Sequence, residues 1–464
     1  MNATPQPSAL TLSLSMEFDR KQLGAGKEHF ARLLISVPQA SSDALAPARR
    51  GLALAIALDT SGSMSSPAGA PDGSPMNFSI PRLGIQSMAL PNESKIERCK
   101  SAIWEAVSLL GDDDMASLTA FSSMAKTLFP MSSMTEPNKA KFKAALDKMS
   151  ASGGTALHAG WSEAGREAAK GIDRKLLCRV AMLTDGEASD GERNPEELAR
   201  QSATLASLGV STSCFGVGAS FNEDLLCAMA DAGEGNFRYI PDAMLAAAAA
   251  VDEVNGLGAT AGRKARLRLI SDEGSTAIEL LNPFDKASDG WLRLPTLLAG
   301  RPIEAVARIS VDKGASMLSL RAEVSWENRD GIEQSAQAQL SAQVVSPEAS
   351  AASPLSAEVA GAAAALMAAS AKTTMAHMIS AGNFAGASAC LEDARSMMSS
   401  TMDYSGSLSE MASLNSLTAS MSSGDFASAR KTAVFQSYTR SKNQTVMDNT
   451  VQSTPTQGSD QSKP

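Results

Sequence analysis

The segment LALAIALDTSGSM, residues 52–64, decides how this sequence folds. Its first seven residues are apolar, which is typical of a β-strand covered by helices on both faces. The run ends abruptly at Asp59, and two hydroxyls follow at alternate positions, Ser61 and Ser63. Such residues at the end of a strand can cap backbone amides in a turn, or they can form part of a binding site.

Residues 50–260 alternate apolar strands with amphipathic helices. This alternation predicts a mostly parallel, Rossmann-like sheet with helices on both faces. A second apolar strand, 177–184, ends at Asp185 in the sequence LTDGEAS. Ligands of such sheets bind at the carboxyl ends of the strands, so both aspartates stand where a site is expected.

The flanking segments have β character instead. Residues 9–39 and 263–345 alternate polar and apolar side chains, including GWLRLPTLL at 290–298, which predicts antiparallel strands. We expect the two segments to form one β-sandwich, with the α/β unit inserted between them. An Ala-, Met- and Ser-rich helical region follows, in which AGNFAGA and SGDFASA predict two similar helical hairpins. The expected division is 1–49 (first sandwich strands), 50–260 (α/β domain), 261–346 (rest of the sandwich), 347–440 (helical region) and 441–464 (disordered tail).

The composition argues against several classes of protein: nucleic-acid binders, membrane-spanning proteins and disulfide-rich secreted proteins. The chain has 464 residues, of which 44% are hydrophobic and 20% charged, and its net charge is −9. Without basic clusters we expect no binding to nucleic acid, and without a long apolar run we expect no membrane span or secretory signal. The cysteines are odd in number and scattered, which favours a reducing cytoplasm over a disulfide framework. They are Cys99, Cys178, Cys214, Cys227 and Cys390.

A metal site emerges if the strands ending at Asp59 and Asp185 are neighbours. Thr155, in the glycine turn SGGTAL, would then join them together with Ser61 and Ser63. Two carboxylates and three hydroxyls are hard oxygen donors, which suit Mg²⁺, Mn²⁺ or Ca²⁺ rather than zinc. With only two formal negative charges, the ion would keep positive character and an open position for the carboxylate of another protein.

The motifs LALDTSGSM, GGTAL and MLTDGEAS, in this order, resemble the von Willebrand factor A family with its metal-ion-dependent adhesion site. The resemblance covers about residues 50–257 and implies that Asp59, Ser61, Ser63, Thr155 and Asp185 bind the metal, directly or through water. It also implies a protein-interaction module that grips an acidic group of its partner and is not itself an enzyme.

The flanking strands and the stretch 210–240 look like bacterial, intracellular members of the family. Several of those resemble components of systems with an AAA+ ATPase, or with a Ser/Thr kinase and phosphatase, so these are the partners that the resemblance implies. Many family members run from the first motif almost directly into a helix. Here a long loop, 64–94, intervenes and is expected to shape or cover the partner site.

The alternative function is a metal-dependent hydrolase that uses the same carboxylates. Such an enzyme needs a general base near the metal, and the candidates are His158 and Glu187. A histidine on a helix face and a solvated loop carboxylate are the plainer interpretations of these two residues.

Overall fold

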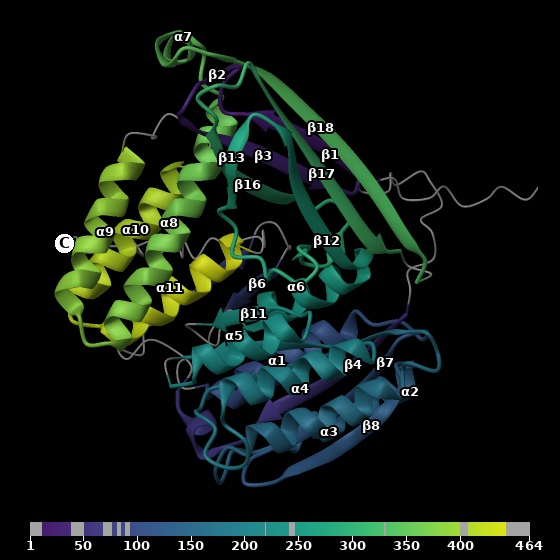
Figure 1. The fold of residues 1–464 in the computed structure, drawn as a ribbon. Coiled ribbons are helices and arrows are strands. Elements are labelled where there is room, and N and C mark those ends of the chain that lie inside the picture. The colour runs from purple at the N-terminus through teal and green to yellow at the C-terminus, as the bar shows by residue number, and fades with distance from the viewer. Residues whose placement is uncertain are drawn as a thin grey trace, which may run out of the picture.

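Three modules make up the protein in the computed structural model (Figure 1). A β-sandwich lies above an α/β domain, and a bundle of C-terminal helices lies beside both. The structure describes residues 12–38, 51–67, 77–80, 85–88, 93–218, 220–240, 246–328, 331–399 and 407–441. The expected tail therefore lies almost entirely outside the described residues.

The α/β domain is built on a six-stranded sheet of order β11-β10-β9-β4-β7-β8. All neighbouring strands are parallel except β7 and β8, so the predicted fold class is confirmed. The strands are β4 (Leu52–Asp59), β7 (Met115–Phe121), β8 (Ala125–Ser133), β9 (Leu177–Thr184), β10 (Val210–Val217) and β11 (Phe237–Ile240). The helices are α1 (Lys95–Ser108), α2 (Glu136–Asp147), α3 (Leu157–Ala169), α4 (Pro195–Ser207), α5 (Glu223–Ala232) and α6 (Ala246–Gly258).

Strand β4 is apolar throughout because helices cover both of its faces. Its leucines and Ile56 pack in one core with α1, α2 and α6, whereas its alanines pack in another with α3, α4 and α5. The small alanine face lets α3 approach closely. A Cβ atom at Gly160 of α3 would lie 2.4 Å from the ring of Phe121, so only glycine fits there.

Both flanking segments contribute to one β-sandwich. Strand β3 (Glu28–Ser36) pairs antiparallel with β16 (Ile303–Val311), which confirms that the α/β domain is inserted between two parts of the sandwich. The first sheet also contains β1 (Ser13–Phe18) and β13 (Ser275–Leu280). The second contains β14 (Leu292–Arg293), β12 (Thr260–Glu273), β17 (Met317–Glu327), β18 (Glu333–Val345) and β2 (Gln22–Gly24), with β15 (Leu297–Leu298) paired to β12.

The segment 290–298 is not the continuous strand that its alternation suggested. It is split into β14 and β15 around Pro295, which has no amide hydrogen for a ladder hydrogen bond. The loop 64–94 also differs from expectation, because it contains a hairpin of β5 (Asn77–Ile80) and β6 (Ile85–Met88). Its other residues between 68 and 92 lie outside the described part.

The C-terminal region contains both expected helical hairpins. The first joins α8 (Ala357–Ser380) to α9 (Phe384–Ser399), and the second joins α10 (Ser407–Ser422) to α11 (Phe426–Ser441); a short helix, α7 (Pro347–Ala352), precedes them. Each turn contains a glycine with positive φ, +73° at Gly382 and +79° at Gly424. The first phenylalanines of α9 and α11 stack with ring centroids 4.1 Å apart, which ties the two turns together. Among the described residues, every helix is too short or too polar to cross a bilayer.

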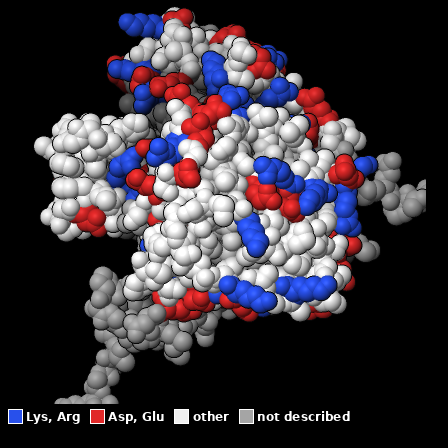
Figure 2. Space-filling model, turned by 90° about the horizontal axis from the view of Figure 1, so that it is seen from below, with Lys and Arg blue, Asp and Glu red and all other residues white. Residues whose placement is uncertain are grey.

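The face of the α/β domain that points away from the sandwich carries charges of both signs. In the view from below, Lys and Arg side chains alternate with Asp and Glu, and neither sign forms a broad continuous patch (Figure 2).

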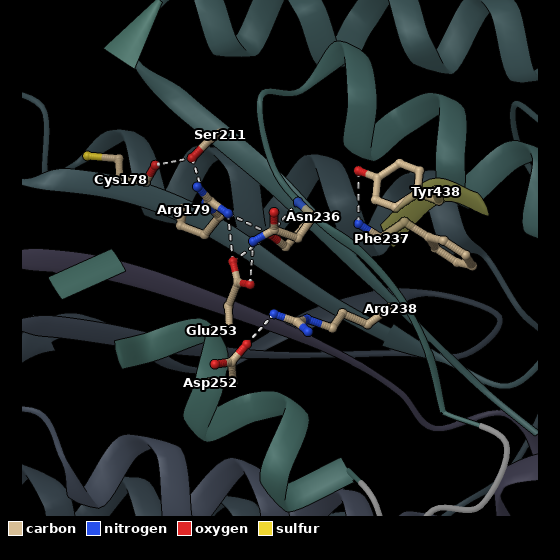
Figure 3. A network of polar contacts seen from close by, with 10 residues as sticks. Cys178, Arg179, Ser211, Asn236, Phe237, Arg238, Asp252, Glu253 and Tyr438 are labelled. Carbon is tan, nitrogen blue, oxygen red and sulfur yellow. Dashed lines mark hydrogen bonds and ion pairs between the residues drawn. The ribbon is translucent and has the colours of Figure 1, made fainter. Parts of the chain in front are cut away.

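Helix α11 is docked on the α/β domain. Phe435 and Tyr438 are buried in the same core as Phe237 and Tyr239 of β11. The Tyr438 hydroxyl accepts a hydrogen bond of 3.2 Å from the amide of Phe237 (Figure 3). Arg440, near the end of α11, contacts Glu304 of the sandwich at 3.1 Å. The helical region is therefore anchored to both other modules.

A buried ionic network joins the α/β domain to the sandwich, and Figure 3 shows the part of it that lies within the α/β domain. Arg179 of β9 donates to Glu253 of α6 at 2.6 Å, with side chains that are 7% and 2% exposed. The neighbouring Asp252 accepts from Arg238 of β11 and, at 2.5 Å, from Arg301 of the sandwich. Since each charge has a partner of opposite sign, the network fixes α6 and the sandwich against the sheet.

We predict that Phe435→Ala will detach the helical region and lower the free energy of unfolding by about 3–5 kcal/mol, because it opens a cavity in a shared core. Denaturant unfolding and limited proteolysis measure the effect. Phe384→Ala is the matched control: this ring is 41% exposed and loses mainly its stacking partner, which corresponds to about 0.5–1.5 kcal/mol. Equal losses in the two variants would show that α11 does not depend on this contact.

Candidate metal site

Asp59 and Asp185 stand side by side at the carboxyl edge of the sheet. Strands β4 and β9 are parallel neighbours, with Leu58 opposite Leu183, so the residues that follow meet at one place. Both carboxylates belong to fully buried residues, each with 0% exposure. Two buried acids on adjacent strands are costly unless polar groups or a cation compensate them.

Asp59 is held by two donors. The amide of Ser61 donates to its Oδ1 at 2.7 Å, and the hydroxyl of Thr184 donates to its Oδ2 at 2.5 Å. Burial nevertheless raises the pKa of Asp59 from 3.8 to about 6, with a further contribution from the negative charge of Asp185. Thr184 was missing from the sequence prediction, although a polar residue at the end of an otherwise apolar strand was a visible signal.

Asp185 is held by a hydroxyl and an ammonium group. Ser63 donates to its Oδ1 at 2.6 Å, and the Oγ atoms of Ser63 and Ser61 are 3.0 Å apart. The Nζ atom of Lys95, the first residue of α1, lies 2.7 Å from its Oδ2. Sequence reasoning did not identify Lys95, because thirty residues and a loop separate it from the first motif.

Thr155 reaches the same point from a third loop. The loop is fastened to the first one by hydrogen bonds from Gly62 to the carbonyl of Gly153 and from Ser152 to the carbonyl of Thr60. A Cβ atom at Gly186 would lie 3.2 Å from the Thr155 hydroxyl and 3.7 Å from that of Ser63. The structure therefore brings all five predicted residues together.

The donor set fits a hard divalent cation. Three hydroxyls and two carboxylates supply only oxygen, and within the described residues the Thr155 hydroxyl makes no hydrogen bond, which leaves its oxygen for a ligand. The Lys95 ammonium already shows that a cation is stabilised here. Burial, with smaller contributions from the charges of Asp185 and Asp59, raises the pKa of the Cys99 thiol to about 12.

Comparison with known proteins agrees with this geometry. Residues 54–251 match the von Willebrand factor type A domain. This segment has the fold of a von Willebrand factor type A domain. The chain is 28% identical over 155 residues to the uncharacterized protein YfbK of Escherichia coli, covering 33% of this chain and 27% of that protein. It is 27% identical over 231 residues to the uncharacterized protein sll0103 of Synechocystis, covering 50% and 47%. The matched part of the chain thus spans about a quarter of the length of YfbK and about half of the length of sll0103.

Solved structures resemble the chain beyond the von Willebrand factor type A domain. A von Willebrand factor type A protein from Catenulispora acidiphila has a TM-score of 0.64 at 17% identity and covers 96% of this chain and 100% of its own. The ArnB paralog VWA2 from Sulfolobus acidocaldarius has a TM-score of 0.54 at 16% identity, covering 93% and 99%. At such identities the likeness concerns the fold alone, and it includes the flanking modules.

The two residues considered as the general base of a hydrolase, His158 and Glu187, do not contact the candidate metal ligands in the hydrogen bonds described. The His158 ring in α3 stacks on Trp161, and its Nε2 lies 2.9 Å from the side-chain oxygen of Gln201 in α4. Glu187 is exposed on the loop after β9. Among the described residues, no group of three or more His, Cys, Asp or Glu side chains could hold a metal.

A cavity of about 100 Å³ lies at the junction with the sandwich and not at this site. It is lined by the network of Arg179, Glu253, Arg238, Asp252 and Arg301. These five side chains form ion pairs with one another, so we assign the cavity to the packing between the modules and not to a ligand site.

We predict that Asp59→Asn will stabilise the metal-free protein at pH 8 and have little effect at pH 4. Because the folded-state pKa of Asp59 is raised from 3.8 to about 6, its stabilising effect is complete below pH 3.8 and is lost as the pH rises through 6. This shift corresponds to about 3 kcal/mol, which asparagine would recover at pH 8. Denaturant unfolding in EDTA at both pH values measures the difference.

Asp190→Asn is the control, since Asp190 is an exposed carboxylate on the loop after β9, the loop that also carries Asp185. A gain from Asp59→Asn that is the same at pH 4 and pH 8 would contradict an ionisation effect.

Proposed function

We propose that this chain is a metal-dependent protein-interaction module. Its von Willebrand factor type A domain would bind one divalent cation, Mg²⁺ or Mn²⁺, at a metal-ion-dependent adhesion site. Asp59, Ser61, Ser63, Thr155 and Asp185 would hold the ion, directly or through water. The single observation that supports this most strongly is the convergence of two fully buried carboxylates and three hydroxyls from three loops.

The charges of the site favour an acidic partner. Bound metal would supply a Lewis-acidic position that can accept an additional oxygen ligand. The two protein carboxylates only balance a divalent ion, and the Lys95 ammonium adds a further positive charge. An Asp or Glu side chain of a partner would then meet a net positive centre in a partly desolvated place, where such contacts are strong.

We further propose that the chain acts as an adaptor and not as an enzyme. The hydrogen bond and stacking of His158 orient its ring toward α4 and Trp161, and Glu187 is solvated, so neither is held as a general base. The resemblance to bacterial intracellular proteins suggests a complex with an AAA+ ATPase or a Ser/Thr kinase or phosphatase. The use of Cys99, Cys178 and Cys214 as buried core residues suits a reducing cytoplasm.

The loop 64–94 is proposed to help select the partner. Its base is closed: the amide of Lys95 donates to the carbonyl of Ser66 at 2.9 Å, and Pro67 forms a β-bridge with Ser94. The loop therefore leaves and returns at the edge of the site, directly after Ser63. A partner that contacts the metal would meet these residues at the rim.

Metal binding is tested by calorimetry of the full chain with Mg²⁺ and Mn²⁺. We expect one site in the wild type, at least a tenfold loss of affinity in Asp59→Ala, and no change in Asp190→Asn, which removes an exposed carboxylate from the loop after β9. The loss follows from removal of one of only two carboxylates near the ion. Equal affinity in wild type and Asp59→Ala would refute the assignment.

Partner binding is tested separately by pull-down from the native cell with Mg²⁺, with EDTA, and with Asp185→Ala as bait. A metal-bridged partner should be retained only by the wild type in Mg²⁺ and should bear an acidic residue whose neutralisation releases it. A partner retained equally in all three conditions would contradict metal-bridged binding.

A further inference from the structure

Lys95 occupies an unusual place for a lysine. It is the first residue of α1, and its ammonium donates to Oδ2 of Asp185 at 2.7 Å, with side chains that are 18% and 0% exposed. Its Nζ also lies close to the backbone after β10, since a Cβ atom at Gly218 would be only 3.3 Å from it. The ammonium is thus enclosed between the ends of β9 and β10.

The contacts of Asp185 show that Lys95 belongs to the site. One carboxylate oxygen accepts from Ser63 and the other from Lys95, so both oxygens are engaged before any metal is added. The two buried carboxylates, Asp59 and Asp185, and the one ammonium give the metal-free site a net charge of −1. Without Lys95, two ionised carboxylates would face each other with no compensating charge.

We propose that Lys95 is a built-in cation that sets the metal affinity of this site. It stabilises Asp185 and the Ser63 hydroxyl in the absence of metal, and it weakens metal binding because two cations then share one carboxylate. The inference rests on the proposed function, since it concerns the same site.

The position of Lys95 links its effect on metal affinity to the long loop 64–94. The Lys95 amide closes the base of the loop on Ser66, while its side chain reaches Asp185. One residue therefore joins the base of the loop to the metal ligands. With a divalent ion bound, the charges of the ion, Lys95 and the two carboxylates would sum to +1. Lys95 would therefore weaken metal binding and strengthen the attraction of an acidic group.

The test compares Lys95→Met, which keeps the length of the side chain but not its charge, with Lys95→Arg, which keeps the charge. Lys141→Met is the matched control, because Lys141 is exposed on α2 and its ammonium donates to the side chain of Asn138, away from the candidate site. Calorimetry with Mn²⁺ and Mg²⁺ gives the affinity of the full chain, and thermal unfolding in EDTA gives the stability of the metal-free site.

We expect Lys95→Met to bind Mn²⁺ about tenfold more tightly than the wild type, the scale on which groups bonded to metal ligands act. The same variant should melt at a lower temperature in EDTA, and Lys95→Arg and Lys141→Met should resemble the wild type in affinity. Lys95→Gln serves as a second neutral variant if methionine prevents folding. A folded neutral variant with unchanged or weaker affinity would overturn the proposal.

The outcomes separate this inference from the proposed function. If the wild type binds metal and the neutral variants bind it equally well, only the role of Lys95 fails. If the wild type binds no metal but Lys95→Met does, the ammonium excludes the ion, which supports the inference and refutes metal use by the wild type. If neither binds, both proposals fail.

Discussion

The burial of two carboxylates side by side is the constraint on which the α/β domain depends. Asp59 and Asp185 are both fully buried, on adjacent parallel strands. Such a pair is stable only when each oxygen has a donor, and the donors come from four places: the turn after β4, the end of β9, the start of η1 (Gly62–Ser65) and the start of α1. Even so, the raised pKa of Asp59 shows that its charge is incompletely compensated. The divalent cation that we propose for this site would supply the missing compensation.

The rigidity of the site comes from the packing beneath it. Strand β4 is fixed on one face by leucines and on the other by alanines, and α3 lies so close that Gly160 contacts Phe121. Thr60, directly after Asp59, is bonded to the carbonyl of Phe121, and its own carbonyl accepts from Ser152. The three loops are thus connected to one another through backbone hydrogen bonds, independently of the side chains that face a ligand. Because backbone hydrogen bonds hold the loops, the repulsion between Asp59 and Asp185 does not have to be balanced by a change in the sheet.

The sequence predicted the parts of this structure that local patterns encode. The apolar run 52–58 predicts a buried strand from residues near in sequence. The convergence of the three motifs follows from the alternation of strands and helices, which puts the carboxyl ends of parallel strands at one edge of the sheet. Lys95 could not be assigned, since its role depends on which side chain lies opposite, whereas Thr184 was missed although its place at the end of an apolar strand was a visible signal. The docking of Phe435 and Tyr438 was hidden for the same reason: apolar residues on a helix do not say which module they face. Pro295 is a different case. Its effect is local and could be seen in the sequence, because a proline interrupts a strand even where polar and apolar residues alternate.

The arrangement of modules places helix α11 at the same edge of the sheet as the candidate metal site. Glu223, the first residue of α5, follows the carboxyl end of β10 and is buried against Lys431 of α11 at 2.6 Å, with Arg430 as a second partner. The site lies at the end of β9, and α11 packs on β11, two strands away, which corresponds to about 10 Å across the sheet. Both features therefore share one edge of the sheet. Under the proposed function, a protein that extends an acidic side chain to the site would approach next to α11, whose position is fixed by the ion pairs of Glu223 with Arg430 and Lys431.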